Sequence, residues 1–560
     1  MSQQARVIAD SIKRHGSMPV STDPAAATHL KRTIARLEDA KPANYSWRRY
    51  LIELLHVGAS LEHALMVEYL YAAYTLQVEG AHRDVIKAWQ TSLLMMAKEE
   101  MGHLLTVQNI LSLLGESPYL QRKNYPWDAE FYPFVFTLEP LSRLSVARYA
   151  FAEMPPDWLD DKDHDRRTLK RQLAAVLQNR FGNKAGDPIT HHVGTLYALI
   201  IDILNNPEWI PDSEFDAASY DYQAAWDDWG RGYVLPETPT DDDEDTKDTK
   251  VVMADANVII ERFATRDAAI AALKRIATQG EAPQSHRKRR KGVPLSHFER
   301  FLAMFKQYQR ICSETGQTGW TPTRNMPTNP TTAAGNGIRA RIKDDYAHEW
   351  AGMFNLRYEM LLTYLSHSFR LGRHERLRGV VMNKVFGEMY NLKTIAGILT
   401  GLPLGARGKQ AGPPFEMPKR LLPAGTAPWQ RHKELLQQSR HRAAKLKASR
   451  SKTASVEHRN YLRALDALDD EALRLIDSVL KASPQPALGR VKQVVSGAPK
   501  RDAGEAPTIA NGAAKPIASR IKDVLKLPSK RAVGKIKRGA NGASKRTARR
   551  PARMSQERAR

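Results

Sequence analysis

Several features that are common in proteins of this length are missing from the sequence. Its 560 residues include one cysteine, Cys312, which excludes an internal disulfide framework and a metal site built from cysteines alone. No apolar run approaches the ~20 residues that a membrane-spanning helix needs. The N-terminus, MSQQARVIADSIKRHG, lacks the apolar core and small-residue cleavage site of a secretory signal. We therefore expect a cytoplasmic protein that does not associate with a membrane.

Strand-like alternation of apolar and polar residues is also scarce. Apolar residues instead recur at intervals of three and four over residues 47–77, 83–114 and 188–204, which predicts long helices. Gly115 follows the second of these segments and is a typical helix stop. Further segments with the helical pattern continue to about residue 482. The sequence therefore predicts an all-α fold.

The positive charge is concentrated at the C-terminus. Of the net charge of +24, the segment 483–560 contributes +16, from 20 Lys or Arg against 4 Asp or Glu, and it has no aromatic residue. Such a segment buries too little apolar surface to offset its ordering entropy, so we expect disorder. Basic tails can bind nucleic acid or other polyanions through phosphate contacts, without reading bases. A solubilising extension explains the composition equally well.

These changes in composition divide the chain into four parts. We expect a polar N-terminal segment (1–45), a helical domain with insertions (46–425), a helical extension (426–482) and a disordered Lys/Arg/Ala-rich tail (483–560). Two charge runs inside the helical domain, TPTDDDEDTKDTK and SHRKRRKG, are typical of solvated loops.

The second predicted helix carries polar residues where apolar ones would be expected. The run LMMAKEEMGHLLTVQNILSLLG places Glu99, Glu100 and His103 among leucines and methionines. Glu100 and His103 are three residues apart, so their side chains lie on one face and can reach one ion. We expect Glu99 to be the exposed member of its pair. A solvent-facing stripe is the alternative explanation of the motif.

The first predicted helix offers a matching carboxylate. Glu62 lies between Leu61 and Leu65 on a face that is otherwise apolar. A buried carboxylate is costly without a partner, so two helices with inward glutamates favour a metal site between them. His63 and Glu68 are rival candidates on the same helix.

Four strings of the sequence, taken together, resemble one family. LEHALMVEYLYAAYTL, AKEEMGHLLTVQNILSLLG, QGEAP and SHFERF are similar to the ferritin-like domain of iminophenyl-pyruvate dimer synthases, which are enzymes of violacein-type and indolocarbazole pigment pathways. The resemblance covers about residues 45–420. It implies an all-α fold, a ferritin-like four-helix bundle with additional helices, here followed by the disordered basic C-terminal tail.

The resemblance also implies a metal centre. Its ligands would be Glu62, Glu100, His103, Glu281 and His297. Glu100 would bridge two metal ions, and His103 would bind one ion. A loop separates Glu281 from His297, so helical spacing alone cannot place their side chains at one site. Glu299 follows closely after His297. Thr195 occupies a position where the family pattern has a glutamate, so the resemblance leaves open an iron centre that is di-iron, mononuclear, altered or lost, with manganese as the alternative metal.

Three functions agree with these observations. The first is a metal-dependent oxidoreductase or oxidase acting on a small-molecule substrate, with an amino-acid-derived imine suggested by family analogy alone. The second is a non-catalytic helical bundle whose basic tail binds nucleic acid or another polyanion. Iron storage is a third, although storage ferritins form shells from much shorter chains. The sequence does not reveal the oligomeric state.

Overall fold

The structure, a computed structural model, describes most of the chain between residues 41 and 482. The described residues are 38, 41–129, 132–155, 164–178, 193–225, 228, 258–281, 295–317, 319–334, 340–405, 408–419, 421–422 and 427–482. Within these ranges, every helix is too short or too polar to cross a membrane.

Some predictions concern residues outside these ranges. The C-terminal tail (483–560), nearly all of the N-terminal segment (1–45) and both charge runs lie there. The expected disorder of the tail and its binding to polyanions therefore stay predictions, as does the division into four parts.

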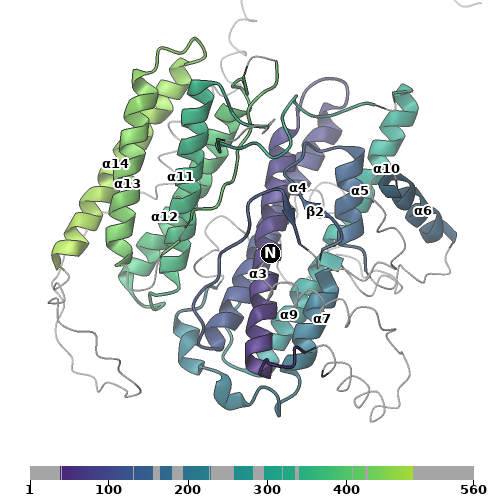
Figure 1. The fold of residues 1–560 in the computed structure, drawn as a ribbon, viewed down its shortest axis with the longest axis vertical. Coiled ribbons are helices and arrows are strands. Elements are labelled where there is room, and N and C mark those ends of the chain that lie inside the picture. Colours follow the sequence, from purple (N-terminus) through teal and green to yellow (C-terminus); the bar gives the residue numbers. More distant parts are fainter. Residues whose placement is uncertain are drawn as a thin grey trace, which may run out of the picture. The chain divides into compact units, whose positions relative to one another are not determined.

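Helices account for almost all of the regular structure (Figure 1). The described residues form eleven α-helices and a single antiparallel ribbon, in which Trp127–Asp128 (β1) pairs with Val135–Phe136 (β2). The prediction of an all-α fold is confirmed.

Two long helices, α3 (Trp47–Thr75) and α4 (Arg83–Leu113), pack against each other (Figure 1). α3 begins where the side chain of Ser46 accepts a hydrogen bond from the backbone N–H of Arg49, a typical N-cap. α4 ends before Gly115, whose φ of +73° lets the chain turn away. The bounds predicted for both helices are correct to within two residues.

Four shorter helices cover this pair. α7 (Val193–Leu204) and α9 (Arg266–Glu281) contact each other, and α5 (Arg143–Ala152) contacts α10 (His297–Thr315). Figure 1 shows α7 and α9 along one half of the long helices and α5 and α10 along the other half. α6 (His164–Gln178) packs on α5. Because α5, α9 and α10 each have a terminus near the middle of the pair, residues at these termini meet there.

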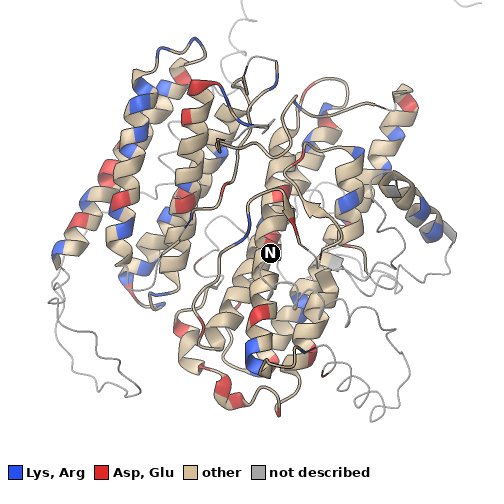
Figure 2. Ribbon diagram, in the orientation of Figure 1, with Lys and Arg blue, Asp and Glu red and all other residues tan. Residues whose placement is uncertain are grey.

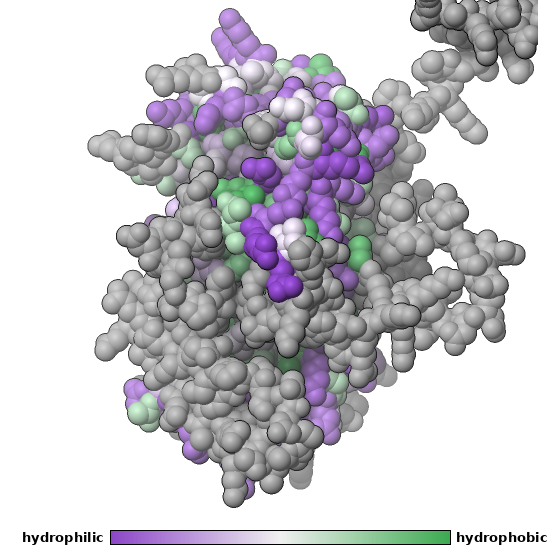
Figure 3. Space-filling model, turned by 90° about the vertical axis from the view of Figure 1, so that its right-hand side faces the viewer, coloured by the Kyte–Doolittle hydropathy of each residue, from purple (hydrophilic) through white to green (hydrophobic). Residues whose placement is uncertain are grey.

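Apolar side chains fill the space between these helices. The core includes fully buried residues of the long helices and of α10, among them Leu54, Leu105, Ile110, Phe301 and Phe305. Burying side chains of this size stabilises the fold by about 1.5–3 kcal/mol each. On the face drawn in Figure 3, the described surface side chains are mostly hydrophilic, with small hydrophobic areas between them.

The last four helices form a second bundle. α11 (Asp345–Ser368) packs on α12 (Arg376–Leu399) and on α13 (Pro428–Ala448), which packs on α14 (Val456–Ala482). α13 carries mainly Lys and Arg, whereas α14 carries several Asp and Glu (Figure 2). Ion pairs such as Lys433 to Asp477, at 2.7 Å, join the two helices.

A buried arginine lies at the centre of this second bundle. Arg357 of α11 forms ion pairs with Glu388 of α12 at 3.0 Å and with Asp469 of α14 at 2.5 Å. It also donates a hydrogen bond to Ser439 of α13. All four residues are at most 5% exposed, so each helix contributes one polar group to a network that is shielded from water.

Candidate metal centre

Carboxylate and imidazole groups meet at the middle of the α3–α4 pair. They belong to Glu62 of α3, Glu100 and His103 of α4, Glu153, which directly follows α5, and His297, the first residue of α10. All five residues are at most 3% exposed. The cluster lies in the interior of the helices, where an unpaired charge would be strongly destabilising.

Three residues of the EEMGH motif on α4, namely Glu100, Gly102 and His103, have positions that the local structure explains. The helical spacing places His103 Nδ1 2.9 Å from Glu100 Oε2. Gly102 lies between them, and a Cβ atom there would be only 3.0 Å from the backbone oxygen of Ile259. A glycine at this position therefore lets the segment 258–260 approach the helix closely.

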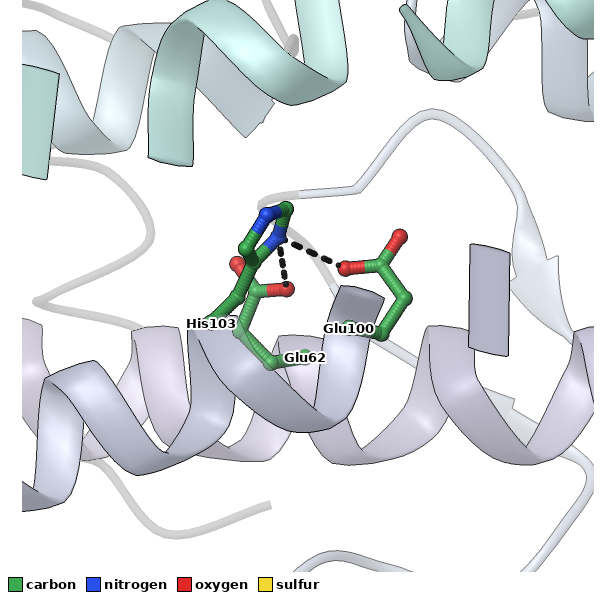
Figure 4. A group of neighbouring side chains, drawn as sticks. All are labelled: Glu62, Glu100 and His103. Atoms are coloured by element: carbon green, nitrogen blue, oxygen red, sulfur yellow. Dashed lines mark hydrogen bonds and ion pairs between the residues drawn. The ribbon is translucent and has the colours of Figure 1, made fainter. Parts of the chain in front are cut away.

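Glu62, Glu100 and His103 form a first group that could hold one ion (Figure 4). His103 Nδ1 lies 3.4 Å from Glu62 Oε2 and 2.9 Å from Glu100 Oε2. One donor atom from each residue lies within 4.8 Å of the other two. Figure 4 shows that both carboxylates point toward the same ring nitrogen.

Glu100, Glu153 and His297 form a second group of the same kind. His297 Nδ1 lies 3.0 Å from Glu100 Oε1 and 3.8 Å from Glu153 Oε1. Glu100 therefore directs one oxygen to each histidine. The His103 and His297 rings are 5.5 Å apart, and their planes differ by 25°. The two groups, which share the Glu100 carboxylate, could therefore hold two adjacent ions.

Three atoms in this cluster are buried without a hydrogen-bond partner in the described part of the chain. They are Glu62 Oε2, Glu100 Oε1 and His297 Nδ1. Carboxylate oxygens can only accept, and a neutral imidazole nitrogen without hydrogen also only accepts. An ion in the first group would satisfy Glu62 Oε2, and an ion in the second would satisfy Glu100 Oε1 and His297 Nδ1, so the donor set fits metal ions.

The raised pKa values of residues in the cluster agree with a shortage of positive charge there. Burial, together with the neighbouring Glu100, raises the pKa of Glu62 to about 8. Burial alone would lower the pKa of His103, but Glu100 and Glu62 outweigh it and raise that pKa to about 10. The pKa of His297 is likewise raised, against burial, by Glu100. In the absence of metal, protons on the histidines thus neutralise the carboxylates.

A small cavity borders the cluster on the side of α7 and α9. The volume open to a water-sized sphere is ≈ 10 Å³, which is room for about one water molecule. Its wall includes Leu65, Tyr197, Ile276, Ala277 and Gly280. A Cβ atom at Gly280 would lie 3.1 Å from Glu153 Oε2, so the glycine keeps space open beside that carboxylate.

This geometry agrees with comparisons to known proteins. Residues 55–306 match the family model described as Ferritin-like. This part of the chain is a ferritin-like domain. It contains both groups of candidate ligands, so the predicted resemblance and fold are confirmed for the region that holds the cluster.

Two curated relatives match a longer stretch of the chain. Dichlorochromopyrrolate synthase from Lentzea aerocolonigenes is 23% identical over 414 residues, which cover 67% of this chain and 36% of the relative. The 2-imino-3-(indol-3-yl)propanoate dimerase from Chromobacterium violaceum is 25% identical over 418 residues, covering 68% of this chain and 35% of the relative. The alignments thus span about a third of each relative. No solved structure matches the chain.

The ferritin-like domain brings together four of the five predicted ligands: Glu62, Glu100, His103 and His297. Glu281 is the last residue of α9, and its side chain lies outside the described part of the structure. Its neighbour Gln279 is described and contacts the cluster, because its Oε1 lies 2.9 Å from His103 Nε2.

The prediction for Glu99 is wrong. This residue was expected to be the exposed member of its pair, but it is 0% exposed. Its Oε2 atom lies 2.9 Å from His297 Nε2, and both of its oxygens bind Arg300. The physical reason is that α10 packs on α4, and His297 and Arg300 of α10 cover the side of α4 that carries Glu99.

The rival candidates have other roles. His63 Nδ1 lies 3.1 Å from the backbone oxygen of Leu120, and its other nitrogen bonds to the hydroxyl of Tyr358. Glu68 accepts a hydrogen bond from the backbone of Thr137. Glu299 accepts one from the backbone N–H of Ser296 at 2.9 Å, which completes a capping box at the start of α10.

Thr195, which was expected to occupy the position of a family glutamate, is half-buried on α7 and is not among the residues that line the cavity. Two residues further along, Tyr197 donates a hydrogen bond to Glu62 Oε1. The hydroxyl therefore occupies one oxygen of Glu62 and leaves Oε2 facing His103.

Glu153 was missed from the sequence. It directly follows α5, where its carboxylate accepts a hydrogen bond of 2.7 Å from the hydroxyl of Tyr69. A signal was present in YAFAEMPP, because a glutamate at the C-terminal end of a short apolar helix is unfavourable with the helix dipole. An acid in such a place needs a positive partner, which here is His297, whose Nδ1 lies 3.8 Å from Glu153 Oε1.

Proposed function

We propose that the ferritin-like domain binds two transition-metal ions, iron or manganese, and that the protein is a metal-dependent oxidoreductase. The observation that supports this best is Glu100, which directs one oxygen toward each of two histidines in a dry interior. Ferritin-like bundles build paired metal positions from inward glutamates and Glu-x-x-His motifs.

Each residue of the cluster has a definite part in this proposal. Glu62 and His103 would hold one ion, Glu153 and His297 the other, and Glu100 both. Mixed carboxylate and imidazole donors suit iron and manganese. When bound, such ions supply one-electron chemistry with oxygen or peroxide.

The protein around the cluster controls access to it. Tyr197 and Tyr69 fix the orientation of Glu62 and Glu153 through hydrogen bonds. Apolar residues such as Leu65 and Ile276 exclude bulk water, and the adjoining cavity has room only for a very small ligand. In this conformation the cavity holds a ligand of about the size of a water molecule, so an aromatic substrate requires movement of the cavity wall.

The names of the two relatives suggest the first substrates to test. One relative is named as a dimerase of 2-imino-3-(indol-3-yl)propanoate, so we propose small imino acids as the substrate class. The test compares metal-loaded, chelator-treated and reloaded protein for bound iron and manganese, and for oxygen consumption with imino acids. We expect about two ions per chain and metal-dependent oxygen uptake. Protein that binds neither metal after reloading would refute the proposal.

Metal binding should release protons. At neutral pH, Glu62, whose pKa is raised to about 8, and His103, whose pKa is raised to about 10, are both protonated in the metal-free protein. An ion can bind only their deprotonated forms, so each ion at this position should displace about two protons, and affinity should rise with pH. Calorimetric titration in buffers with different ionisation enthalpies measures this number. A binding heat that is independent of the buffer would contradict the prediction.

A further inference from the structure

Two adjacent glutamates of α4 contact different nitrogens of the His297 ring. Glu100 approaches Nδ1 inside the cluster, while Glu99 approaches Nε2. Glu99 Oε2 lies 2.9 Å from Nε2 of His297, on the far side of the ring from the ligand group. Glu99 therefore touches the histidine through the nitrogen that faces away from the ion position.

Arg300 fixes Glu99 in this place. Its two terminal nitrogens lie 2.8 Å from Oε2 and 3.0 Å from Oε1 of Glu99, so the guanidinium donates a hydrogen bond to each carboxylate oxygen. A forked contact of this kind defines orientation as well as charge. Arg300 is one turn after His297 on α10, and the helix thus delivers both the histidine and the cation that secures its partner.

The other histidine has a different partner at the same position of its ring. His103 Nε2 lies 2.9 Å from Oε1 of Gln279, a neutral amide. The two ion positions are therefore similar in their ligands but differ in the group behind each imidazole: a carboxylate behind His297 and an amide behind His103.

This difference has a chemical consequence. An acceptor at Nε2 keeps the N–H on that nitrogen and leaves the lone pair of Nδ1 for an ion. A carboxylate does this and also makes the imidazole a stronger base, whereas an amide supplies orientation with little added charge. Loss of such an outer contact commonly weakens metal binding by about 10–100-fold.

We propose that Glu99 and Arg300 are positioning residues that make the His297 position the tighter of the two metal positions. The inference rests on the proposed function, because it assumes that both positions bind an ion. It also explains why α4 carries two consecutive glutamates: the second binds metal, and the first orients a histidine from a helix about 200 residues later in the chain.

Stepwise addition of Co²⁺ to the metal-free full-length chain, followed by visible absorption, tests the proposal. We expect two binding phases in the wild-type protein, and His297→Ala should remove the tighter one. Glu99→Gln gives His297 the same neutral acceptor that His103 has, so that phase should weaken by about 10–100-fold and the two affinities should converge. The reciprocal variant Gln279→Glu should tighten the weaker phase.

The outcomes separate this inference from the proposed function. A wild-type protein that binds no Co²⁺ overturns the two-metal centre itself. If the wild-type protein shows two phases and Glu99→Gln leaves both unchanged, or weakens both equally, the positioning role alone is overturned. Thermal unfolding of the metal-free variants serves as the control for folding. Should Glu99→Gln fail to fold, Arg300→Lys replaces it: selective weakening of the tighter phase supports the proposal, and no change overturns it.

Discussion

Substitution of Glu100 by glutamine should remove metal from both positions of the ferritin-like domain at once. Glu100 is the residue common to both candidate groups, with Oε2 near His103 and Oε1 near His297. The glutamine is almost the same size, but it takes away the shared negative charge and one acceptor oxygen. We expect bound iron or manganese to fall from about two ions per chain to near zero under equal loading.

Glu68→Gln is the matched control for this substitution. Glu68 is also a glutamate buried on a long helix of the domain, but its carboxylate bonds to the backbone of Thr137 and belongs to neither group. Metal content measured by elemental analysis should therefore be retained in Glu68→Gln. If Glu100→Gln loses a single ion, the centre has no bridging carboxylate. If both variants lose metal equally, the loss reflects general damage to the bundle.

The part of the centre within α3 and α4 could be predicted from local sequence. Glu100 and His103 share a face because of helical spacing, and the apolar neighbours of Glu62 indicated that its side chain is buried. Glu99 could not be predicted in this way. Its position on α4 was clear, but the helix that covers it begins at His297, and sequence spacing carries no information about that contact.

Glu153 illustrates a second limit. It lies beyond the end of a ten-residue helix, α5, and reaches the cluster because α5 packs against α10. A ligand supplied by a helix terminus has no periodic neighbours to reveal it. The same holds for Gln279, near the end of α9, which contacts His103. The long helices of the fold follow from periodicity, whereas the meeting of three helix ends follows from tertiary packing.

The second bundle allows the largest predicted loss of stability. Arg357→Met should lower the free energy of unfolding by about 3–5 kcal/mol, because it leaves Glu388 and Asp469 buried without their cation. Arg440→Met is the matched control on α13. Its ion pair with Asp470 has side chains that are 52% and 40% exposed, and such surface pairs contribute about 0–1 kcal/mol.

Urea unfolding of the two variants, followed by circular dichroism, measures the difference. A further variant distinguishes the lost cation from lost packing: Arg357→Met combined with Glu388→Gln and Asp469→Asn removes the stranded charges as well. Because an uncompensated buried charge is costly and a neutral amide much less so, this triple variant should regain part of the lost stability. Equal destabilisation of Arg357→Met and the triple variant would mean that the arginine stabilises the bundle by filling space, and that its charge contributes little.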